Sequence, residues 1–291
     1  MGKENRNTIF VDEGEVLSVQ GFPDKQYIMR IAAPKVAAHA RPGAFVHIRC
    51  NPEIPMRRPI SLMRVNATEG WIEIYYKVVG TGLRALGKAQ VGDLISILGP
   101  IGNGFSANPA SSNQLMIGGG VGIPPMLFLA ETLHADTEHK WSPLVFMGSE
   151  SPFPFELTPS AIALSGMPHD ATACVPDIEQ VGIASRLASQ QNYAGVHKGF
   201  VTELARAWLL ANPDKQKTTE IYACGPEPML AAVAKLVAEF NIDAQLCLEE
   251  YMACAVGGCA GCAVEVHTKN GTAMKRVCVD GPVFKASEIY A

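Results

Sequence analysis

The sequence predicts a multi-domain protein with three parts. These are an antiparallel β-barrel over residues 1–107, a Rossmann-like α/β domain with a parallel sheet over 108–240, and a small C-terminal module over 241–291. Short strand-like runs fill the first part, strand and helix patterns alternate in the second, and four closely spaced cysteines mark the third. A chain of 291 residues suits two or three domains, because one domain typically takes about 100–150 residues.

The strand-like runs of the first part are rich in β-branched and aromatic residues. They lie at 16–19, 26–31, 44–49 and 71–79. Turn clusters such as those at 21–24 and 91–93 separate them. Many short strands joined by turns are typical of a small antiparallel barrel.

After a polar linker at 108–113, apolar runs alternate with helical patterns. Strands are predicted at 114–117, 143–147, 171–175 and 220–224, and helices at about 124–134 and 227–240. Alternation of this kind implies a parallel sheet with helices on both faces.

The composition excludes several classes of protein. Hydrophobic residues make up 48% of the chain and charged residues 18%, which describes a globular protein with an ample core. The net charge is −4 and the basic residues are scattered, so no nucleic-acid-binding face is expected. No apolar run approaches the length of a membrane span, and the polar residues 1–7 do not form a signal peptide or a myristoylation motif. Eight cysteines without an export signal indicate a cytoplasmic protein.

Cys254, Cys259, Cys262 and Cys278 have the spacing C-x4-C-x2-C-x15-C. Most of the residues between the first three cysteines are Gly or Ala, and these small residues let backbone N–H groups approach sulfur. The pattern is typical of a plant-type [2Fe-2S] cluster. Structural zinc is the main alternative, although it usually uses two C-x2-C pairs, and a disulfide is disfavoured because nothing suggests export.

A glycine-rich turn follows the predicted strand at 114–117. Gly119, Gly120 and Gly122 would let backbone amides approach a pyrophosphate at the start of the next helix. Prolines replace the third glycine of the usual dinucleotide fingerprint, so a glycine-rich turn without a ligand is the alternative.

Two more turns end strands of the same predicted sheet. Glu150 can accept hydrogen bonds from a ribose and would repel a 2′-phosphate, which favours NAD over NADP. A solvated surface glutamate explains it equally well. Cys224 and Gly225 lie where a nicotinamide would bind, and a tight turn with a small buried cysteine is the alternative.

One segment of the first part combines a cation, a rigid proline turn and a hydroxyl group. It consists of Arg58, Pro59, Ile60 and Ser61. Arg58 can bind a phosphate bidentately, and Ser61 can hydrogen-bond a flavin ring. Taken alone, a surface arginine beside a proline turn explains the segment.

Together these motifs resemble the ferredoxin–NADP reductase superfamily. The cysteine module, which ends in the Arg-Val-Cys-Val-Asp-Gly-Pro-Val-Phe segment at 276–284, is similar to the electron-transfer subunit of class 1B dihydroorotate dehydrogenase. The resemblance covers nearly the whole chain. It departs from the family at 80–83, where Gly-Thr-Gly-Leu replaces a Gly-x-Gly-Thr turn, so a hydroxyl contact from position 83 is in doubt.

The resemblance implies three cofactors and the residues that bind them. FAD would lie on Arg58, Pro59, Ile60, Ser61, Tyr75, Tyr76, Lys77 and Gly82. NAD would lie on Gly119, Gly120, Gly122, Glu150, Cys224 and Gly225. The [2Fe-2S] cluster would take the four cysteines named above.

The function implied by the resemblance is that of an NAD-dependent oxidoreductase subunit of pyrimidine biosynthesis. Electrons would pass between a partner dehydrogenase and NAD+ through the cluster and FAD, with no acid–base pair. The partner would be the FMN-containing dihydroorotate dehydrogenase catalytic subunit, in a hetero-oligomer, because this chain has no room for a catalytic barrel. Two alternatives stay open: a related NAD(P)H-dependent reductase serving ferredoxin, polysulfide or an oxygenase, and a non-enzymatic metal-binding redox sensor.

Overall fold

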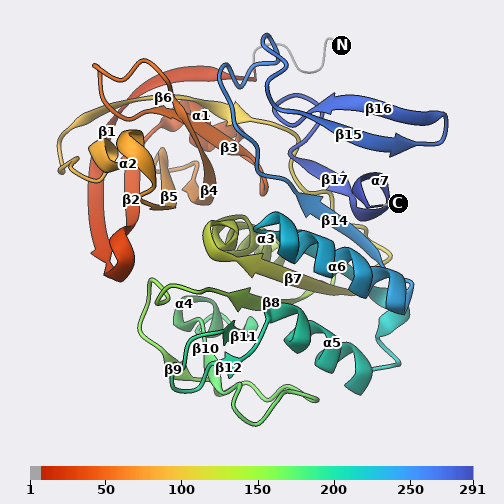
Figure 1. Ribbon diagram of the computed structural model, residues 1–291. Helices are drawn as coiled ribbons and strands as arrows, with labels where there is room; N and C mark the ends of the chain where they lie inside the picture. The colour runs from red at the N-terminus through yellow and green to blue at the C-terminus, as the bar shows by residue number, and fades with distance from the viewer. Residues whose placement is uncertain (1–7, 291) are drawn as a thin grey trace.

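The computed structural model describes residues 8–290, and residues 1–7, where no signal peptide was expected, lie outside the described residues. A barrel, a layered α/β unit and a small module follow one another along the chain (Figure 1). The predicted fold class is confirmed. No helix between residues 8 and 290 has the length and hydropathy needed to cross a membrane.

Six antiparallel strands close the barrel in the order β1-β2-β5-β4-β3-β6. Side chains alternate between the two sides of each strand, so that Ile31, Ile48, Leu62 and Ile74 fill the interior. Two short helices accompany the barrel. The strands are β1 (Phe10–Phe22), β2 (Gln26–Ala32), β3 (Phe45–Arg49), β4 (Arg58–Asn66), β5 (Trp71–Lys77) and β6 (Leu94–Ile101), and the helices are α1 (Pro34–His39) and α2 (Gly80–Leu86).

The α/β unit is built on a seven-stranded sheet in the order β12-β11-β8-β7-β13-β14-β17. Neighbouring strands are parallel except β14 and β17, which are antiparallel. The strands are β7 (Asn113–Gly119), β8 (Ser142–Gly148), β11 (Ala184–Ser189), β12 (His197–Lys198), β13 (Thr219–Cys224), β14 (Asp243–Cys247) and β17 (Val283–Lys285).

Helices cover both faces of this sheet, as the alternating pattern predicts. On one face lie α3 (Ile123–Ala135) and α4 (Pro176–Glu179), beside the short paired strands β9 (Thr158–Pro159) and β10 (Ala173–Cys174). On the other face lie α5 (Val201–Ala211) and α6 (Glu227–Phe240). The side chains of α3 also pack against the barrel strand β4, which joins the two units.

The four cysteines lie in the segment 248–282, which leaves the sheet after β14 and returns to it at β17. The segment contains the hairpin β15 (Ala263–Thr268) and β16 (Gly271–Arg276), and α7 (Ala286–Ile289) follows β17. The predicted boundary at residue 241 therefore separates β14 from the sheet in which it pairs with β13. The cysteine segment is a long insertion between two neighbouring strands.

Candidate functional site

Two turns interlock at the carboxyl ends of β7 and β13. A Cβ atom on Gly119 would lie 2.5 Å from Met229 Sδ, and one on Gly122 would lie 2.3 Å from the carbonyl oxygen of Cys224. A side chain at Gly122 would push the turns apart, because the atoms that it would meet belong to the backbone of Cys224 and Gly225. Glycine is required here because the two backbones approach so closely.

Gly120 differs from its neighbours because its Cα faces open space. Among residues 8–290, no heavy atom outside its two chain neighbours lies within 4 Å of a Cβ built on it, and its φ of +55° falls in the left-handed region that favours glycine. The helix α3 begins three residues later, at Ile123, with prolines in its first turn. An open backbone at the start of a 13-residue helix suits a phosphate group, since free N–H groups and the helix dipole both favour an anion.

Glu150 and Cys224 stand at the same edge of the sheet in different surroundings. Glu150 is exposed and comes two residues after the end of β8. The Cys224 thiol is fully buried, and its contact with Cys247 together with its burial raises its pKa well above the ordinary value. Gly225 occupies a tight turn, where a Cβ would lie 2.6 Å from Met229 Cε. The exposed carboxylate can meet a ligand, whereas the buried thiol stays neutral.

A cationic pocket lies at one side of the barrel. The Arg58 guanidinium extends over α2, where a Cβ on Gly82 would lie 2.8 Å from Arg58 Nε. Beside it is a cavity of about 450 Å³ lined by three cations, Arg49, Arg84 and Lys88. Thr81 also lines it, next to Gly82. This cluster of positive charge around a glycine turn fits the phosphates of a dinucleotide such as FAD.

The segment after Arg58 lies on β4 opposite β3. Pro59 pairs with His47, and Ser61 pairs with Phe45. Ile60 points into the barrel interior and is 6% exposed, whereas Ser61 remains partly exposed. Of these residues, Ser61 therefore offers the accessible polar group.

Three consecutive side chains of β5 point into different surroundings. They belong to Tyr75, Tyr76 and Lys77. Tyr76 is 2% exposed and packs in the barrel core, where it stacks on Tyr27 at 5.5 Å. Tyr75 points outward, packs in the cluster shared with α3 and donates a hydrogen bond to Gln26. Strand alternation sends the two rings to opposite sides. Lys77 extends toward Asp24 and Ser151.

The Lys77 ammonium joins the barrel to the α/β unit. It lies 2.5 Å from Asp24 Oδ2 and 2.7 Å from Ser151 Oγ. Ser151 directly follows Glu150, so this contact ties the barrel to the loop after β8. The contact was not predicted.

The cysteine loop wraps closely around its own sulfurs. The N–H of Cys259 donates to Cys254 Sγ at 3.4 Å, and the N–H of Gly261 donates to Cys259 Sγ at 3.4 Å. A Cβ on Gly261 would lie 3.5 Å from Cys259 Sγ. Ala255 and Ala260 adopt left-handed backbone with φ near +55°, which tightens the loop further. Backbone donors facing sulfur are what thiolate ligands require.

The four sulfurs form two pairs. Cys262 Sγ and Cys278 Sγ are 3.3 Å apart and buried, whereas Cys254 and Cys259 are neighbours nearer the surface. Within residues 8–290, no three His, Cys, Asp or Glu side chains gather around a single metal position. Two neighbouring thiols on each side suit a two-iron centre, in which each iron takes two thiolates.

The surroundings shift the pKa values of these thiols in opposite directions. Burial alone would raise the pKa of Cys254, but N–H groups of Val256, Gly258 and Cys259 lower it to about 7. Burial and the neighbouring Cys262 raise the pKa of Cys278 to about 12. The Cys254 thiol is thus more readily ionised than the Cys278 thiol.

An apolar cluster joins the cysteine segment to the barrel. Cys262 and Cys278 pack with Phe45 of β3, Ile101 of β6 and Phe284 of β17. Phe45 is the β3 partner of Ser61 on β4. The cluster that contains the buried thiols therefore includes the neighbour of Ser61 on the adjacent strand.

Two family models match parts of this chain. Residues 249–290 match the iron-sulfur cluster binding domain of dihydroorotate dehydrogenase B, and residues 116–235 match an oxidoreductase NAD-binding domain. The electron transfer subunit of dihydroorotate dehydrogenase B (NAD(+)) from Bacillus caldolyticus is 34% identical over 94% of this chain and 96% of its own length. The chain belongs to this family.

Other relatives and solved structures agree with the assignment. The electron transfer subunit from Desulforamulus reducens is 30% identical over 96% of this chain and 98% of its own length. A chain of the NADH-dependent reduced ferredoxin-NADP oxidoreductase superposes with a TM-score of 0.76 at 25% identity, over 96% of this chain and 90% of that one. The ferredoxin reductase of carbazole 1,9a-dioxygenase, at 23% identity and a TM-score of 0.62, covers 80% of this chain and 67% of its own and shares the fold.

Sequence reasoning missed the cations of the barrel pocket. Arg49 ends β3, whereas Arg84 and Lys88 lie in and after α2, so they come from separate segments of the chain. Their spacing forms no motif. The signal that was available is that Arg84 follows the glycine turn at 80–82.

Proposed function

We propose that the chain is the electron-transfer subunit of a dihydroorotate dehydrogenase of the NAD-linked type, in pyrimidine biosynthesis. In this proposal it relays electrons between a separate catalytic subunit and NAD+ through a [2Fe-2S] cluster and FAD. The observation that carries the proposal is the buried cluster that contains Cys262, Cys278 and Phe45, since it brings a four-thiolate loop next to the barrel segment that contains Ser61.

In this proposal the barrel holds FAD and the sheet holds NAD. Arg58, with the backbone of Gly82 and the cations of the 450 Å³ pocket, binds the pyrophosphate side of FAD. Ser61 and Tyr75 lie toward the ring, whereas Tyr76 supports the strand from inside the barrel. A bound flavin exchanges two electrons with a nicotinamide and single electrons with an iron-sulfur cluster.

The NAD site and the cluster site use backbone groups more than side chains. The turn that contains Gly119, Gly120 and Gly122 would bind the pyrophosphate of NAD, with the open backbone of Gly120 nearest to it, and Glu150 accepts from its ribose. The N–H donors around Cys254 and Cys259 stabilise the thiolate form. The buried residues around Cys262 and Cys278 exclude water from the other half.

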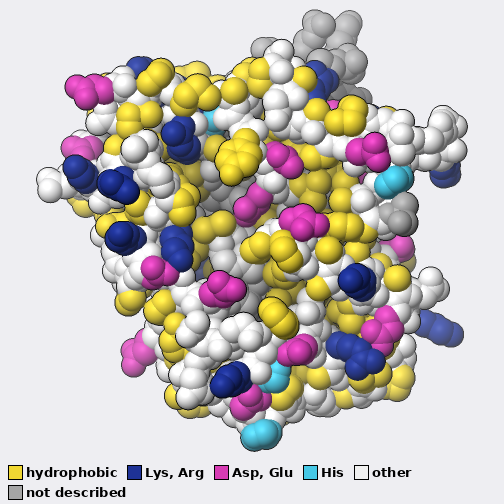
Figure 2. All heavy atoms as spheres, viewed as in Figure 1, with side chains coloured by type: hydrophobic (Ala, Val, Ile, Leu, Met, Phe, Trp, Pro, Cys, Tyr) yellow, Lys and Arg dark blue, Asp and Glu magenta, His cyan; other side chains and the backbone are white. Residues whose placement is uncertain are grey.

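The proposal also covers assembly. The cluster module comprises residues 248–282, and the exposed side near Cys259 faces the FMN-containing catalytic subunit in a cytoplasmic hetero-oligomer. Acidic and basic side chains are interspersed over the face drawn in Figure 2, which is unlike the continuous basic surface of a nucleic-acid-binding protein.

Purification without oxygen tests the cofactor content directly. We expect about two irons and one FAD per chain, the absorption bands of a [2Fe-2S] protein, and flavin-dependent oxidation of NADH by ferricyanide. Zinc in place of iron, or no flavin, would refute the proposal and favour a metal-binding sensor.

A second candidate has one observation in its favour. The chain superposes with a TM-score of 0.76, over 96% of its length, on a chain of an NADH-dependent reduced ferredoxin-NADP oxidoreductase. A reductase serving ferredoxin would reduce ferredoxin from NADH or NADPH without any catalytic subunit. Ferredoxin reduction that exceeds dihydroorotate-driven NAD+ reduction would favour this candidate.

A further inference from the structure

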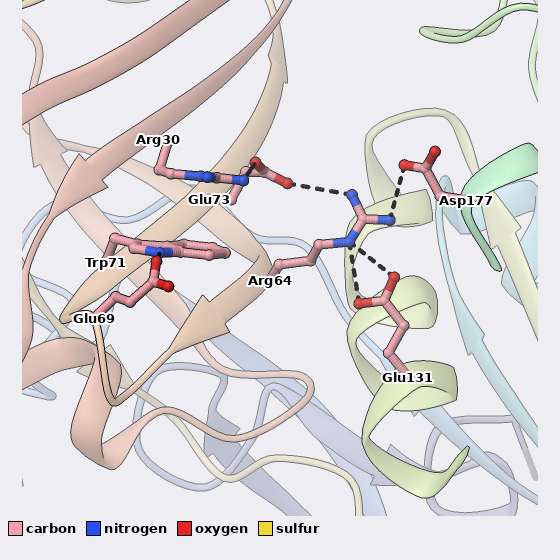
Figure 3. Close-up of polar contacts among 7 residues, drawn as sticks. All are labelled: Arg30, Arg64, Glu69, Trp71, Glu73, Glu131 and Asp177. Carbon is pink, nitrogen blue, oxygen red and sulfur yellow. Dashed lines mark hydrogen bonds and ion pairs between the residues drawn. The ribbon is translucent and has the colours of Figure 1, made fainter. Parts of the chain in front are cut away.

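Arg64 connects three elements across the junction of the barrel and the α/β unit (Figure 3). Its Nε lies 2.8 Å and 3.1 Å from the two carboxylate oxygens of Glu131 on α3. Its Nη1 lies 3.2 Å from Glu73 on β5, and its Nη2 lies 3.4 Å from Asp177 on α4. One guanidinium of β4 therefore binds a carboxylate of its own barrel and two of the neighbouring unit.

The surroundings of Arg64 keep its side chain in one position. The Arg64 side chain is 21% exposed and that of Glu73 is 9% exposed. Glu73 also accepts from Arg30 at 3.0 Å, and the Arg30 guanidinium stacks on Trp71 at 3.9 Å. Exposed ion pairs contribute little, but removing one partner of a buried pair leaves a charge without compensation. Replacing Arg64 would therefore take the guanidinium partner from Glu131, whereas Glu73 would keep Arg30.

A cleft lies beside Arg64, so ion pairs there add to the packing of α3 on β4. A cavity of about 640 Å³ lies between the units and is lined by both. Arg30 and Arg64 line it from the barrel, and Phe153, Asp177 and Tyr193 line it from the α/β unit. Side-chain packing alone does not close this part of the junction.

The two elements that Arg64 joins are those that carry the proposed cofactor sites. Ser61 precedes Arg64 by three residues on β4, and α3 begins at Ile123, directly after the open Gly120 turn. Glu131 lies eight residues further along α3, about 12 Å up a rigid helix at 1.5 Å per residue. A shift of α3 against β4 moves the Gly120 turn relative to Ser61.

We propose that Arg64 is a positioning residue for hydride transfer: it holds α3 against β4 and thereby sets the distance between nicotinamide and flavin. The proposal rests on the proposed function. A misplacement of about 1 Å between reacting groups can cost about a hundredfold in rate. The expected loss is therefore in the rate of the chemical step and not in the binding of either cofactor.

Rapid mixing of the oxidised holoprotein with NADH tests this, with Arg64→Met, Arg64→Lys and the control Arg206→Met. Arg206 pairs with Glu239 at 2.7 Å on the exposed surface of the α/β unit, so its replacement leaves the junction intact. Arg64→Met should lower the limiting rate of flavin reduction about tenfold or more, with flavin content and the half-saturating NADH concentration unchanged. Arg64→Lys should recover part of the rate, and Arg206→Met should match the wild type.

An unchanged limiting rate in Arg64→Met, or a loss confined to NADH affinity, would overturn the proposal. Hydrogen exchange of the same variants gives a readout that needs no turnover. Amides of α3 and β4 should exchange faster in Arg64→Met and not in Arg206→Met, and equal exchange would also overturn the proposal.

A wild type that NADH does not reduce would refute the proposed function, while the exchange comparison would still decide whether Arg64 holds the units together. If Arg64→Met fails to fold, Arg64→Lys decides by the same two measurements.

Discussion

Protonation of His47 is expected to destabilise the folded protein. His47 lies on β3 and is 1% exposed, so its imidazole is buried. Burial, followed by the charge of Arg57, lowers its pKa from the ordinary 6.5 to about 4. The unfolded chain therefore binds this proton more tightly than the folded protein, so stability is complete above pH 6.5 and falls as the pH drops toward 4.

The size of the effect follows from the pKa difference. At about 1.4 kcal/mol per pH unit, a change from 6.5 to about 4 corresponds to about 3 kcal/mol of the free energy of unfolding. This is a large share of the roughly 5–15 kcal/mol that stabilises a typical domain.

Urea titrations at several pH values between 7.5 and 4 measure this loss in the wild type, in His47→Phe and in the control His39→Gln. His39 is exposed on α1, so its variant should follow the wild type. His47→Phe should lose about 3 kcal/mol less than the wild type over this range, because phenylalanine has no ring nitrogen to protonate. Parallel losses in wild type and His47→Phe would refute the reasoning.

Three further substitutions test the cofactor sites. Cys259→Ser should abolish the iron-sulfur absorption and leave NADH oxidation by ferricyanide largely intact; loss of both would contradict a modular relay. Glu150→Arg should raise the use of NADPH relative to NADH, measured as the ratio of kcat/KM values, and an unchanged ratio would mean that Glu150 does not face the ribose. Gly82→Val should weaken FAD binding about tenfold or more in equilibrium dialysis, because its Cβ would lie 2.8 Å from Arg58 Nε; unchanged affinity would remove Arg58 from the site.

Local signals in the sequence were enough to predict much of the fold. The helix predicted at about 124–134 is found at Ile123–Ala135, and the helix predicted at 227–240 has these bounds. Both follow an apolar strand and a glycine-containing turn and have proline in the first turn. The hairpin β15–β16 was not predicted, because its strands are largely exposed and lack a clear apolar alternation.

Side-chain positions depended on contacts that no local pattern encodes. The partners of Arg64 lie 9, 67 and 113 residues away, and Lys77 meets Asp24 from 53 residues away. Strand alternation, by contrast, is a local rule. It already implies that Tyr75 and Tyr76 point to opposite sides of β5, so a set of flavin contacts that includes both rings cannot come from one face.

Reconstitution with a dihydroorotate dehydrogenase catalytic subunit tests the central claim most directly. The two purified proteins are mixed without oxygen, dihydroorotate and NAD+ are added, and NADH formation is followed at 340 nm. The proposed function predicts NADH only when both proteins are present, and none when the Cys259→Ser variant replaces this chain. No NADH from a complex fully loaded with flavin and iron-sulfur cluster would contradict it.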